Sequence, residues 1–521
     1  MTRVVMIGID GLDADLLRVY GPSLPHLRRL MLESPFLELT SSFPPETAPA
    51  WASLYTGLHP SNHGLMSPSN QDIVSPGTPR GYPAARAAAH GASRGLNGMS
   101  FWEQASRAGK RVCVINPQLS YPPRSTNAAN EVNGVLLTVP PLRHKEREPQ
   151  REPEHVALTQ PFPAVPSSLL RQPKRHLAEW CKELRTLTLQ QAERGLELFQ
   201  HERWDMFYQQ FDTLEQIQHA LWRYCDPGDV AYPGRNRHAS GILDFYRLFD
   251  TIIGHFRALL EADDVLLVVS AHGHGRRCAF HLNLNEWLRQ QELLAVHAHA
   301  RRLLHRRYVV DWTKYHAHEV LAHWSGLHSA PSGQRGHYST HLIDQADTIA
   351  QAVSLADGSP YGGIILNRDG IEREGKTYEA TRSLIVQRLR QLRVRGRPVV
   401  YWIDVRENVC RGEYSEYYPD ICFELQNEFA VSTAVHVLLV TNEPPRSQSL
   451  MSGEHRMHGV CLLGHKSHAL NLRESIKEPS VMDIAPTVLQ LLGVERTDGD
   501  GQAFAAMTLA ENAMVTTLTS S

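Results

Sequence analysis

The amino-acid sequence predicts an α/β protein with a mostly parallel sheet covered by helices on both faces. Two observations support this fold class. Short apolar, β-branched runs alternate along the chain with longer amphipathic stretches, and polar residues stand at the ends of several apolar runs. The predicted architecture is therefore a three-layer αβα sandwich, interrupted by loop or cap insertions.

The predicted elements follow one another along the whole chain. The clearest strands cover residues 4–9, 111–115, 206–210, 265–270, 363–366 and 399–403. The clearest helices, in which apolar residues recur at helical spacing, cover 187–199, 242–260, 378–392 and 481–492. Open α/β sheets bind ligands at the carboxyl ends of their strands. Asp10, Asp212 and Ser270 are predicted to stand at such ends.

Three segments interrupt this alternation. Residues 66–98 are rich in Ser, Pro, Gly, Ala and Arg, and residues 140–175 are rich in Pro, Arg and Glu, so both are predicted to be loop insertions. Residues 297–359 are dense in His and Arg and are predicted to form a cap or lid insertion. For the second half of this segment, a flexible solvated loop is an equal alternative.

Charge and cysteine content limit the classes of function. With 53 basic and 55 acidic side chains, the balance indicates neither a nucleic-acid-binding surface nor an acidic tail. The seven cysteines are scattered and form no C-x-x-C pair, which is typical of reduced thiols. The amino terminus has no secretory signal pattern, and no apolar run approaches the roughly 20 residues of a membrane helix. A cytoplasmic protein without a membrane segment is expected.

The most informative pattern lies in the first 64 residues. The first apolar run ends at Asp10, Thr47 stands in Pro-Pro-Glu-Thr-Ala-Pro-Ala-Trp at 44–51, and Thr-Gly-Leu-His-Pro-Ser-Asn-His-Gly follows at 56–64. A carboxylate at a strand end can hold a metal, and a hydroxyl at a helix start can receive a phosphoryl group. Alone, Asp10 would be a turn residue and Thr47 a helix N-cap. Together they favour a site that combines a metal, a nucleophile and an anion cradle.

These runs resemble the alkaline phosphatase superfamily, specifically its type I phosphodiesterase / nucleotide pyrophosphatase family. The resemblance extends from about residue 3 to residue 493, outside the insertions. It implies an alkaline-phosphatase-like fold in which Asp10 binds metal and Thr47 is both the nucleophile and a metal ligand. It also implies a divalent metal cofactor of one or two ions, for which zinc fits best and Mn²⁺ is chemically acceptable.

Later motifs supply further ligands that the resemblance implies. Glu215 and His219 stand four residues apart, which places both on one face of a helix. The family has Asp at the position of Glu215, so the carboxylate ligand is either Glu215 or Asp212 one turn earlier. Ser-Ala-His-Gly at 270–273 resembles the family's Ser-Asp-His-Gly, which assigns His272 to the metal site.

Ala271 stands where the family has the second Asp of that motif. A methyl group cannot ligate a metal. The second metal would then keep Asp10, His272 and the Thr47 oxygen, unless His274 or a more distant carboxylate joins them.

The last ligand comes from late in the chain. In Gly-Glu-His-Arg-Met-His-Gly at 453–459, His455 matches the family's final histidine ligand, whereas His458 either has no role or supports a ligand. Because ligands from position 10 to position 455 must converge, residues 1–521 are predicted to form a single catalytic domain. Asn70 is a candidate for binding a substrate phosphate oxygen, since the family often places an Asn shortly after the His-Gly pair.

The resemblance thus implies a metal-dependent phosphoesterase that hydrolyses phosphodiester or pyrophosphate bonds of a small-molecule substrate through a phosphoryl-threonine intermediate. No nucleic-acid partner is expected. Ala271 leaves two alternatives open. One is a catalytically impaired member that binds a phosphorylated ligand or a partner without turnover, and the other is an enzyme with one metal.

Overall fold

The computed structural model describes residues 2–66, 96–120, 132–137, 176–297, 342–356, 358–436, 438–441, 451–465, 471–472, 478–496 and 499–506. Asn70 and most of the predicted insertions 66–98, 140–175 and 297–359 lie outside the described residues. The chain forms two compact units. Unit 1 comprises Met1–Leu65, Arg86–Gly275 and His455–Ser521, and unit 2 comprises Met66–Ala85 and Arg276–Glu454.

A seven-stranded sheet with the order β2-β18-β6-β1-β5-β3-β4 forms the centre of unit 1. Its strands are β1 (Val4–Ile9), β2 (Phe36–Thr40), β3 (Val112–Ile115), β4 (Gly134–Leu137), β5 (Met206–Phe211), β6 (Val265–Ser270) and β18 (His458–His465). Neighbouring strands pair in parallel, except where β18 pairs antiparallel with β2 and with β6. The predicted mostly parallel sheet is confirmed.

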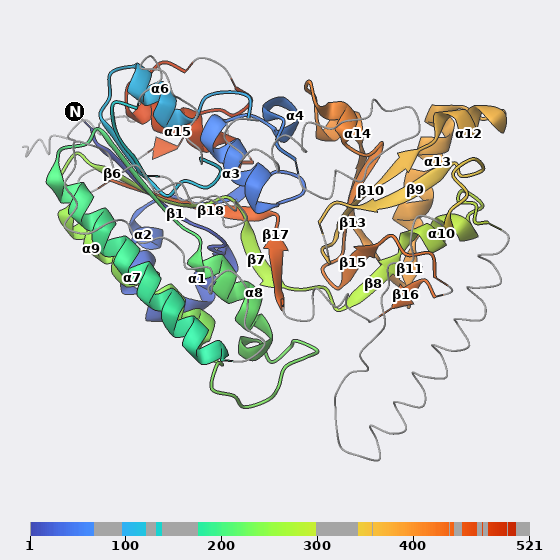
Figure 1. Ribbon diagram of the computed structural model, residues 1–521, viewed down its shortest axis with the longest axis horizontal. Helices are drawn as coiled ribbons and strands as arrows, with labels where there is room; N and C mark the ends of the chain where they lie inside the picture. The colour runs from blue at the N-terminus through green and yellow to red at the C-terminus, as the bar shows by residue number, and fades with distance from the viewer. Residues whose placement is uncertain are drawn as a thin grey trace, which may run out of the picture. The chain divides into compact units, whose positions relative to one another are not determined.

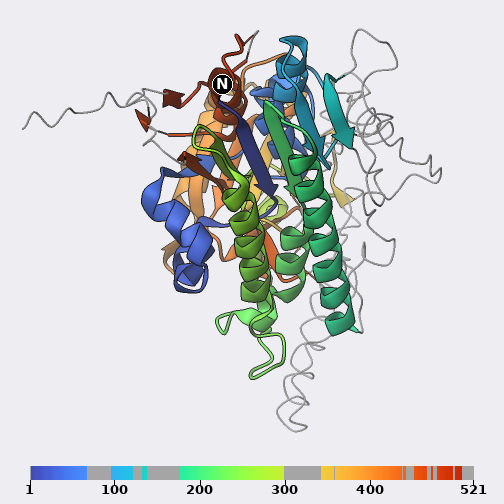
Figure 2. The same cartoon turned by 90° about the vertical axis from the view of Figure 1, so that its left-hand side faces the viewer.

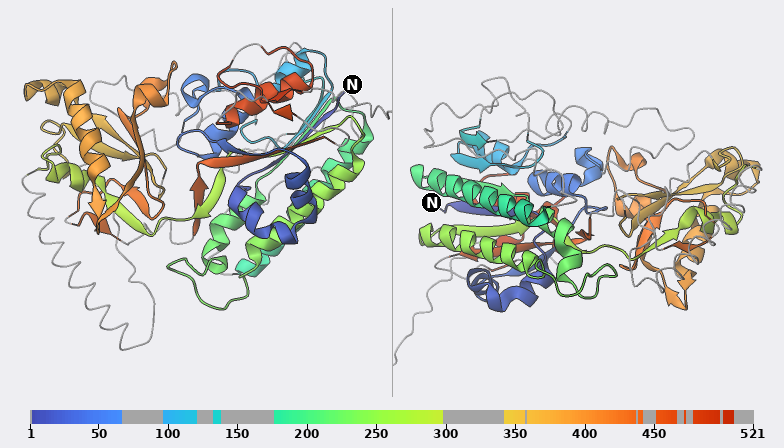
Figure 3. Two further views of the ribbon diagram at one scale, coloured as in Figure 1. Left: turned by 180° about the vertical axis from the view of Figure 1, so that it is seen from behind. Right: turned by 60° about the horizontal axis from the view of Figure 1, so that its bottom comes forward.

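Helices cover both faces of this sheet (Figure 1). One layer consists of α1 (Ala14–Tyr20), α2 (Pro25–Glu33), α7 (Leu177–His201), α8 (Thr213–Cys225) and α9 (Gly241–Leu259), with the short 3-10 helix η1 (Gly21–Ser23) between α1 and α2. The other layer consists of α3 (Thr47–Thr56), α6 (Phe101–Arg107) and α15 (Ile484–Leu491), with α4 (Pro60–His63) and η8 (Val481–Asp483) beside them. Figures 2 and 3 show the sheet between these layers from other sides.

The two faces of β1 illustrate why the sandwich forms. Val5, Ile7 and Ile9 pack into the cluster with α7, α8 and α9, whereas Val4 and Met6 pack into the cluster with α3, α6 and α15. Successive side chains of a strand point to opposite faces, so a run that is apolar throughout needs a helix layer on each face. All six residues of β1 are buried.

The order of the strands determines where the polar residues gather. β1 lies between β5 and β6, and all three run in the same direction. Asp10, Asp212 and Ala271 directly follow these three strands, so they stand together at the carboxyl edge of the sheet. Beyond β6 the chain continues into β7 (Gly273–Arg276), which pairs with β17 (Gly453–Arg456).

Unit 2 contains a four-stranded antiparallel sheet with the order β13-β14-β10-β9. Its strands are β9 (Ala350–Ser354), β10 (Tyr361–Leu366), β13 (Val400–Val405) and β14 (Ile421–Leu425). The predicted strands 363–366 and 399–403 overlap β10 and β13, so they belong to this sheet and not to the central parallel sheet. The reason is that both pair with β14, a partner that local sequence does not specify.

Unit 2 contains further elements, several of which contribute side chains to the apolar core of this sheet. They are β8 (Phe280–Asn283), α10 (Leu284–Gln290), α12 (Arg368–Arg373), α13 (Tyr378–Gln391), β11 (Arg393–Val394), β12 (Arg397–Pro398), α14 (Arg406–Val409), η7 (Ser415–Tyr417), β15 (Phe429–Ser432) and β16 (Val440–Thr441). In unit 1, β19 (Asn471–Leu472) pairs with β20 (Ala505–Ala506). Within the described ranges, none of the helices has both the length and the apolar character that crossing a membrane requires.

Candidate active site

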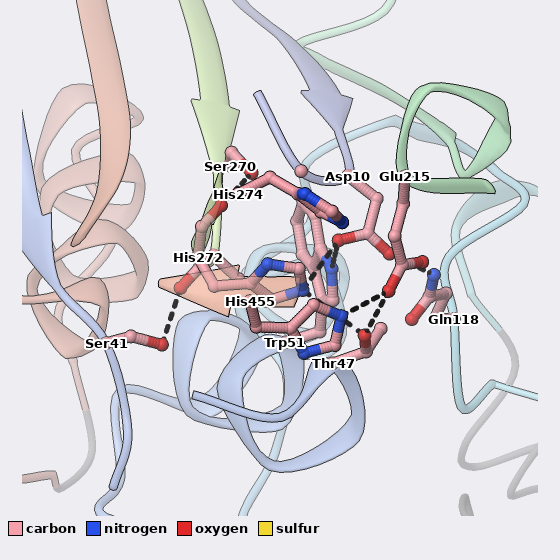
Figure 4. A network of polar contacts seen from close by, with 12 residues as sticks. Asp10, Ser41, Thr47, Trp51, Gln118, Glu215, Ser270, His272, His274 and His455 are labelled. Carbon is pink, nitrogen blue, oxygen red and sulfur yellow. Dashed lines mark hydrogen bonds and ion pairs between the residues drawn. The ribbon is translucent and has the colours of Figure 1, made fainter. Parts of the chain in front are cut away.

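Thr47 is the first residue of α3, and its hydroxyl faces two polar side chains (Figure 4). Thr47 Oγ1 donates to Glu215 Oε1 at 2.7 Å and lies 3.2 Å from His272 Nε2. The N-cap residue, Glu46, makes no side-chain cap hydrogen bond. The helix is ten residues long, and its N-terminus has a partial positive charge that favours an anion beside Thr47.

Asp10 is fully buried and accepts hydrogen bonds at both oxygens. Trp51 Nε1 donates to Oδ1 at 2.9 Å, and Gln118 Nε2 donates to Oδ2 at 2.7 Å. His272 Nε2 lies 3.1 Å from the same Oδ1. A side chain at Gly8 would meet the Trp51 ring at 3.0 Å, so glycine lets that ring lie against β1 and reach Asp10.

Glu215 brings the histidines together. Its Oε1 lies 2.8 Å from His455 Nε2 and 3.6 Å from His219 Nε2, and these two nitrogens are 3.2 Å apart. Glu215 and His219 share one face of α8, as their spacing predicts, and His455 comes from β17. The rings of His272 and His455 stack with centroids 4.1 Å apart.

Burial and nearby charges shift the pKa values of Asp10 and His272. Burial, together with the repulsion of Glu215, raises the pKa of Asp10 to about 6. Burial alone would lower the pKa of His272, but the Asp10 carboxylate raises it to about 9. The two groups therefore form an ion pair in which His272 is an imidazolium near neutral pH.

The other groups are shifted by the same two causes. Burial alone would raise the pKa of Glu215, but hydrogen bonds from His219 and His455 hold it well below its usual range. Burial and the positive charge of His272 lower the pKa of His455 to about 3, so that its ring is neutral. Histidine binds a metal as the neutral imidazole, and glutamate binds a metal as the ionised carboxylate.

Two groups of side chains in the described part of unit 1 have the composition and spacing to hold a metal ion. One consists of Glu215, His272 and His455, and the other of His219, His274 and His455. In each group, one ligand atom per residue lies within 4.8 Å of the others. Carboxylate oxygen and imidazole nitrogen suit a divalent transition-metal cation, so the residues around Glu215 and His455 fit such an ion.

The surroundings of Asp10 do not fit a second ion equally well. Both Asp10 oxygens accept hydrogen bonds from the protein's own donors, Trp51 and Gln118. Ala271 is fully buried in the apolar cluster of the second helix layer, and its carbonyl accepts from Ser41 Oγ at 2.7 Å. Position 271 therefore supplies apolar packing and no carboxylate.

The structure brings together the six residues predicted to bind metal, namely Asp10, Thr47, Glu215, His219, His272 and His455. Of the two candidate carboxylates, Glu215 belongs to a potential metal-holding group, whereas Asp212 belongs to neither of those in the described residues. Burial, with the nearby Asp10 carboxylate, raises the pKa of Asp212 to about 6. His458 is exposed.

Trp51 and Gln118 are site residues that the sequence reasoning did not identify. Trp51 stands four residues after Thr47, and this spacing places both on one face of α3. Gln118 lies three residues beyond the end of β3, so it had only a weak strand-end signal. Neither residue type suggests metal chemistry, so their role as donors to a buried carboxylate becomes visible only in the fold.

The histidines of the run 56–64 have structural contacts. His63 is fully buried, with Nε2 3.0 Å from Ser53 Oγ, and its Nδ1 accepts from the Leu65 backbone at 3.1 Å. His59 is the N-cap of α4 and accepts from the Ser61 backbone at 3.1 Å. This run therefore supports α3, the helix that positions Thr47.

Comparisons with known proteins bear on the fold and the family. Residues 4–366 match the family model described as type I phosphodiesterase / nucleotide pyrophosphatase. No curated protein matches the sequence significantly.

Among solved structures, phosphonoacetate hydrolase from Sinorhizobium meliloti 1021 in complex with phosphonoformate aligns over 95% of both chains with 14% identity and a TM-score of 0.50, which indicates a shared fold. An inactive variant of murine ectonucleotide pyrophosphatase / phosphodiesterase 5 in complex with AMP aligns over 96% of this chain and 98% of its own, with 13% identity and a TM-score of 0.48.

Proposed function

The chain belongs to the type I phosphodiesterase / nucleotide pyrophosphatase family, and from this premise we propose that it hydrolyses phosphodiester or pyrophosphate bonds with Thr47 as the nucleophile. The family consists of phosphoric ester hydrolases within the alkaline phosphatase superfamily. The observation that supports the proposal best is the Thr47 hydroxyl, which lies at a helix N-terminus between Glu215 and His272.

The surrounding side chains orient this hydroxyl and provide an acceptor for its proton. Glu215 Oε1 accepts the hydroxyl hydrogen at 2.7 Å, so it orients a lone pair of Thr47 Oγ1 away from itself and is the nearest acceptor for the proton. The imidazolium of His272, at 3.2 Å, stabilises negative charge as it develops on this oxygen. Attack on phosphorus expels the leaving alcohol or phosphate, and water then releases the phosphoryl group from Thr47.

We propose that the cofactor is zinc, held by Glu215, His219 and His455. Mixed carboxylate and imidazole ligands are typical of zinc sites, although Mn²⁺ is chemically acceptable. A bound divalent cation supplies positive charge that stabilises the attacking and leaving oxygens of an in-line displacement. The apolar packing at Ala271 and the occupied oxygens of Asp10 favour a one-metal enzyme over a two-metal enzyme.

The alternative function is binding of a phosphorylated ligand without turnover. It is favoured by Ala271, because loss of a group that stabilises a transition state costs about 10²- to 10³-fold in rate. The complete arrangement around Thr47 favours hydrolysis, since a binding site alone has no need of an oriented hydroxyl.

We place the reaction in the cytoplasm, because none of the seven cysteines forms a disulfide.

Hydrolysis of bis-para-nitrophenyl phosphate and para-nitrophenyl phosphate, with added Zn²⁺, tests this function. We expect the native chain to cleave the diester faster than the monoester and Thr47→Ala to lose at least about 10³-fold in rate. Thr186→Ala, at an exposed position of α7, is the matched control and keeps native activity. If the native chain cleaves neither ester faster than Thr47→Ala does, the chain is a binding protein and not an enzyme.

A further inference from the structure

His274 is a buried histidine that the chemistry above does not use. It stands in β7, is 2% exposed, and neither of its ring nitrogens has a hydrogen-bond partner among the described residues. A neutral imidazole has one donor and one acceptor, and buried polar atoms are nearly always paired. The two unpaired ring nitrogens therefore indicate that His274 binds a partner that the protein itself does not supply.

The backbone around His274 is fixed in place. Its amide donates to Asp13 Oδ2 at 3.2 Å, while the other oxygen of Asp13 caps α1 by accepting from Leu16 at 3.0 Å. The His274 ring stacks on Trp222, with centroids 5.6 Å apart and an interplanar angle of 23°. The side chain is held in one orientation by packing, which is the condition for an organised ligand.

This orientation places His274 beside two of the proposed metal ligands. Its ring centroid is 4.5 Å from that of His219 and 5.8 Å from that of His455, and one nitrogen of each ring lies within 4.8 Å of the others. Ligand nitrogens of a tetrahedral zinc ion are about 3.3 Å apart, given a Zn–N distance of about 2.05 Å. His219 Nε2 and His455 Nε2, 3.2 Å apart, have this spacing in the structure.

We propose that His274 is a direct ligand of the cation, in a site of three imidazoles, His219, His274 and His455, and one carboxylate, Glu215. This inference rests on the metal dependence proposed above and adds a ligand at a position that follows the family's Ser-Asp-His-Gly motif. These four side chains would supply the donors without Ala271 or Asp10, and a substrate oxygen would join them as a fifth donor. Three neutral imidazoles and one carboxylate also leave a net positive charge on the ion, as a Lewis acid requires.

Metal binding, measured apart from activity, tests this ligand. Metal-free full-length protein is titrated with Zn²⁺ and, separately, with Co²⁺, whose visible bands report the number of nitrogen ligands. The variants are His274→Ala and His274→Phe, of which the second keeps a ring against Trp222 and removes both nitrogens. His458→Ala, at an exposed histidine of β18, is the matched control.

We expect one ion per native chain. The folded His274 variants should bind the ion at least about 100-fold more weakly and show altered Co²⁺ bands. The reason is that even residues that only support a metal ligand contribute 10- to 100-fold to metal affinity. His458→Ala should bind like the native chain. Native affinity and native Co²⁺ bands in His274→Phe would overturn the inference, as would a native chain that binds neither ion.

The same samples separate this inference from the proposed function. If the native chain binds the ion through His274 but cleaves no phosphoester, the proposed function fails and the ligand assignment stands. If the chain cleaves phosphoesters with Zn²⁺ and His274→Phe keeps native affinity, only the ligand assignment fails.

Discussion

Thr47 Oγ1 donates a 2.7 Å hydrogen bond to Glu215 Oε1, although the two residues are 168 positions apart in the sequence. Glu215 Oε1 also lies 2.8 Å from His455 Nε2. One carboxylate thus connects the proposed nucleophile with the proposed metal ligands. Glutamate is one methylene longer than aspartate, and we expect the carboxylate to need this length to contact both partners.

Shortening this side chain is the first prediction. Glu215→Asp withdraws the carboxylate by about 1.5 Å, one carbon–carbon bond, so its contacts with Thr47 and His455 are lost. We expect about 10- to 100-fold weaker Zn²⁺ binding, measured by titration of metal-free protein, and a parallel loss of diester hydrolysis. Glu183→Asp, exposed on α7, is the control. Activity at or above the native level in Glu215→Asp would contradict this role of the longer side chain.

The second prediction concerns the missing carboxylate. Ala271→Asp introduces a charge at a fully buried position and should lower the free energy of unfolding of the metal-free protein by about 3 kcal/mol. If the new carboxylate joins Asp10 in holding a second Zn²⁺, we expect two ions per chain and restored stability. Stoichiometry by equilibrium dialysis and chemical denaturation with and without Zn²⁺ measure both effects.

Ala271→Asn is the matched control, because it has nearly the same volume and no charge. It should lower stability with or without Zn²⁺ and leave the stoichiometry at one. A second ion in Ala271→Asn, or the same single ion in Ala271→Asp, would show that position 271 does not decide the number of metals.

The sequence predicts the part of the fold that depends on local patterns. The apolar runs 4–9, 206–210 and 265–270 correspond to β1, β5 and β6, and the rule that parallel strands bind ligands at their carboxyl ends anticipates where Asp10 lies. The helix predicted over 242–260 is α9, Gly241–Leu259. These features follow from periodicity and strand direction, which neighbouring residues determine.

Features that depend on distant pairing were not predictable in this way. β18 enters the sheet antiparallel between β2 and β6, and nothing in its own residues indicates that register. Likewise, Trp51 and Gln118 are ordinary residues in the sequence, and their contact with Asp10 arises only when α3 and the loop after β3 meet at β1. The chemical roles of the six converging residues stay predictions until the experiments are done.

The third prediction tests whether the hydrogen bond from Trp51 stabilises the buried negative charge of Asp10. Trp51→Phe removes the Nε1 donor from a buried carboxylate, whereas Trp204→Phe removes a donor from a neutral acceptor, the Leu198 carbonyl at 2.7 Å. Hydrogen bonds to charged groups contribute about 1.5–3 kcal/mol, and neutral ones about 0.5–1.5 kcal/mol. Denaturation at pH 8 should therefore show the larger loss of stability for Trp51→Phe. Equal losses would mean that Asp10 does not depend on this donor.

The fourth prediction is a pH dependence of stability that involves His63. Burial, with the nearby His59, lowers the pKa of His63 to about 3, whereas an unfolded histidine titrates near 6.5. Between these values the unfolded chain binds the proton and the folded chain does not. Stability is therefore fully present above about pH 6.5 and falls with decreasing pH by about 1.4 kcal/mol per pH unit from this residue.

Native protein and His63→Gln are compared by urea denaturation from pH 4 to pH 8. The native curve should fall more steeply toward acid than the His63→Gln curve, because the variant lacks this titration. His201→Gln, at the exposed end of α7, should run parallel to the native curve. Parallel curves for native and His63→Gln would contradict the low pKa of His63.

The most direct test of the account is to trap the covalent intermediate. Native protein with Zn²⁺ is mixed with a phosphodiester, quenched in acid within one turnover, digested and analysed by mass spectrometry. The account predicts an adduct on Thr47 in the native chain, in which the phosphoryl group keeps its remaining ester substituent, and no adduct in Thr47→Ala. Hydrolysis that proceeds at the native rate in Thr47→Ala, or an adduct on another residue, would contradict Thr47 as the nucleophile.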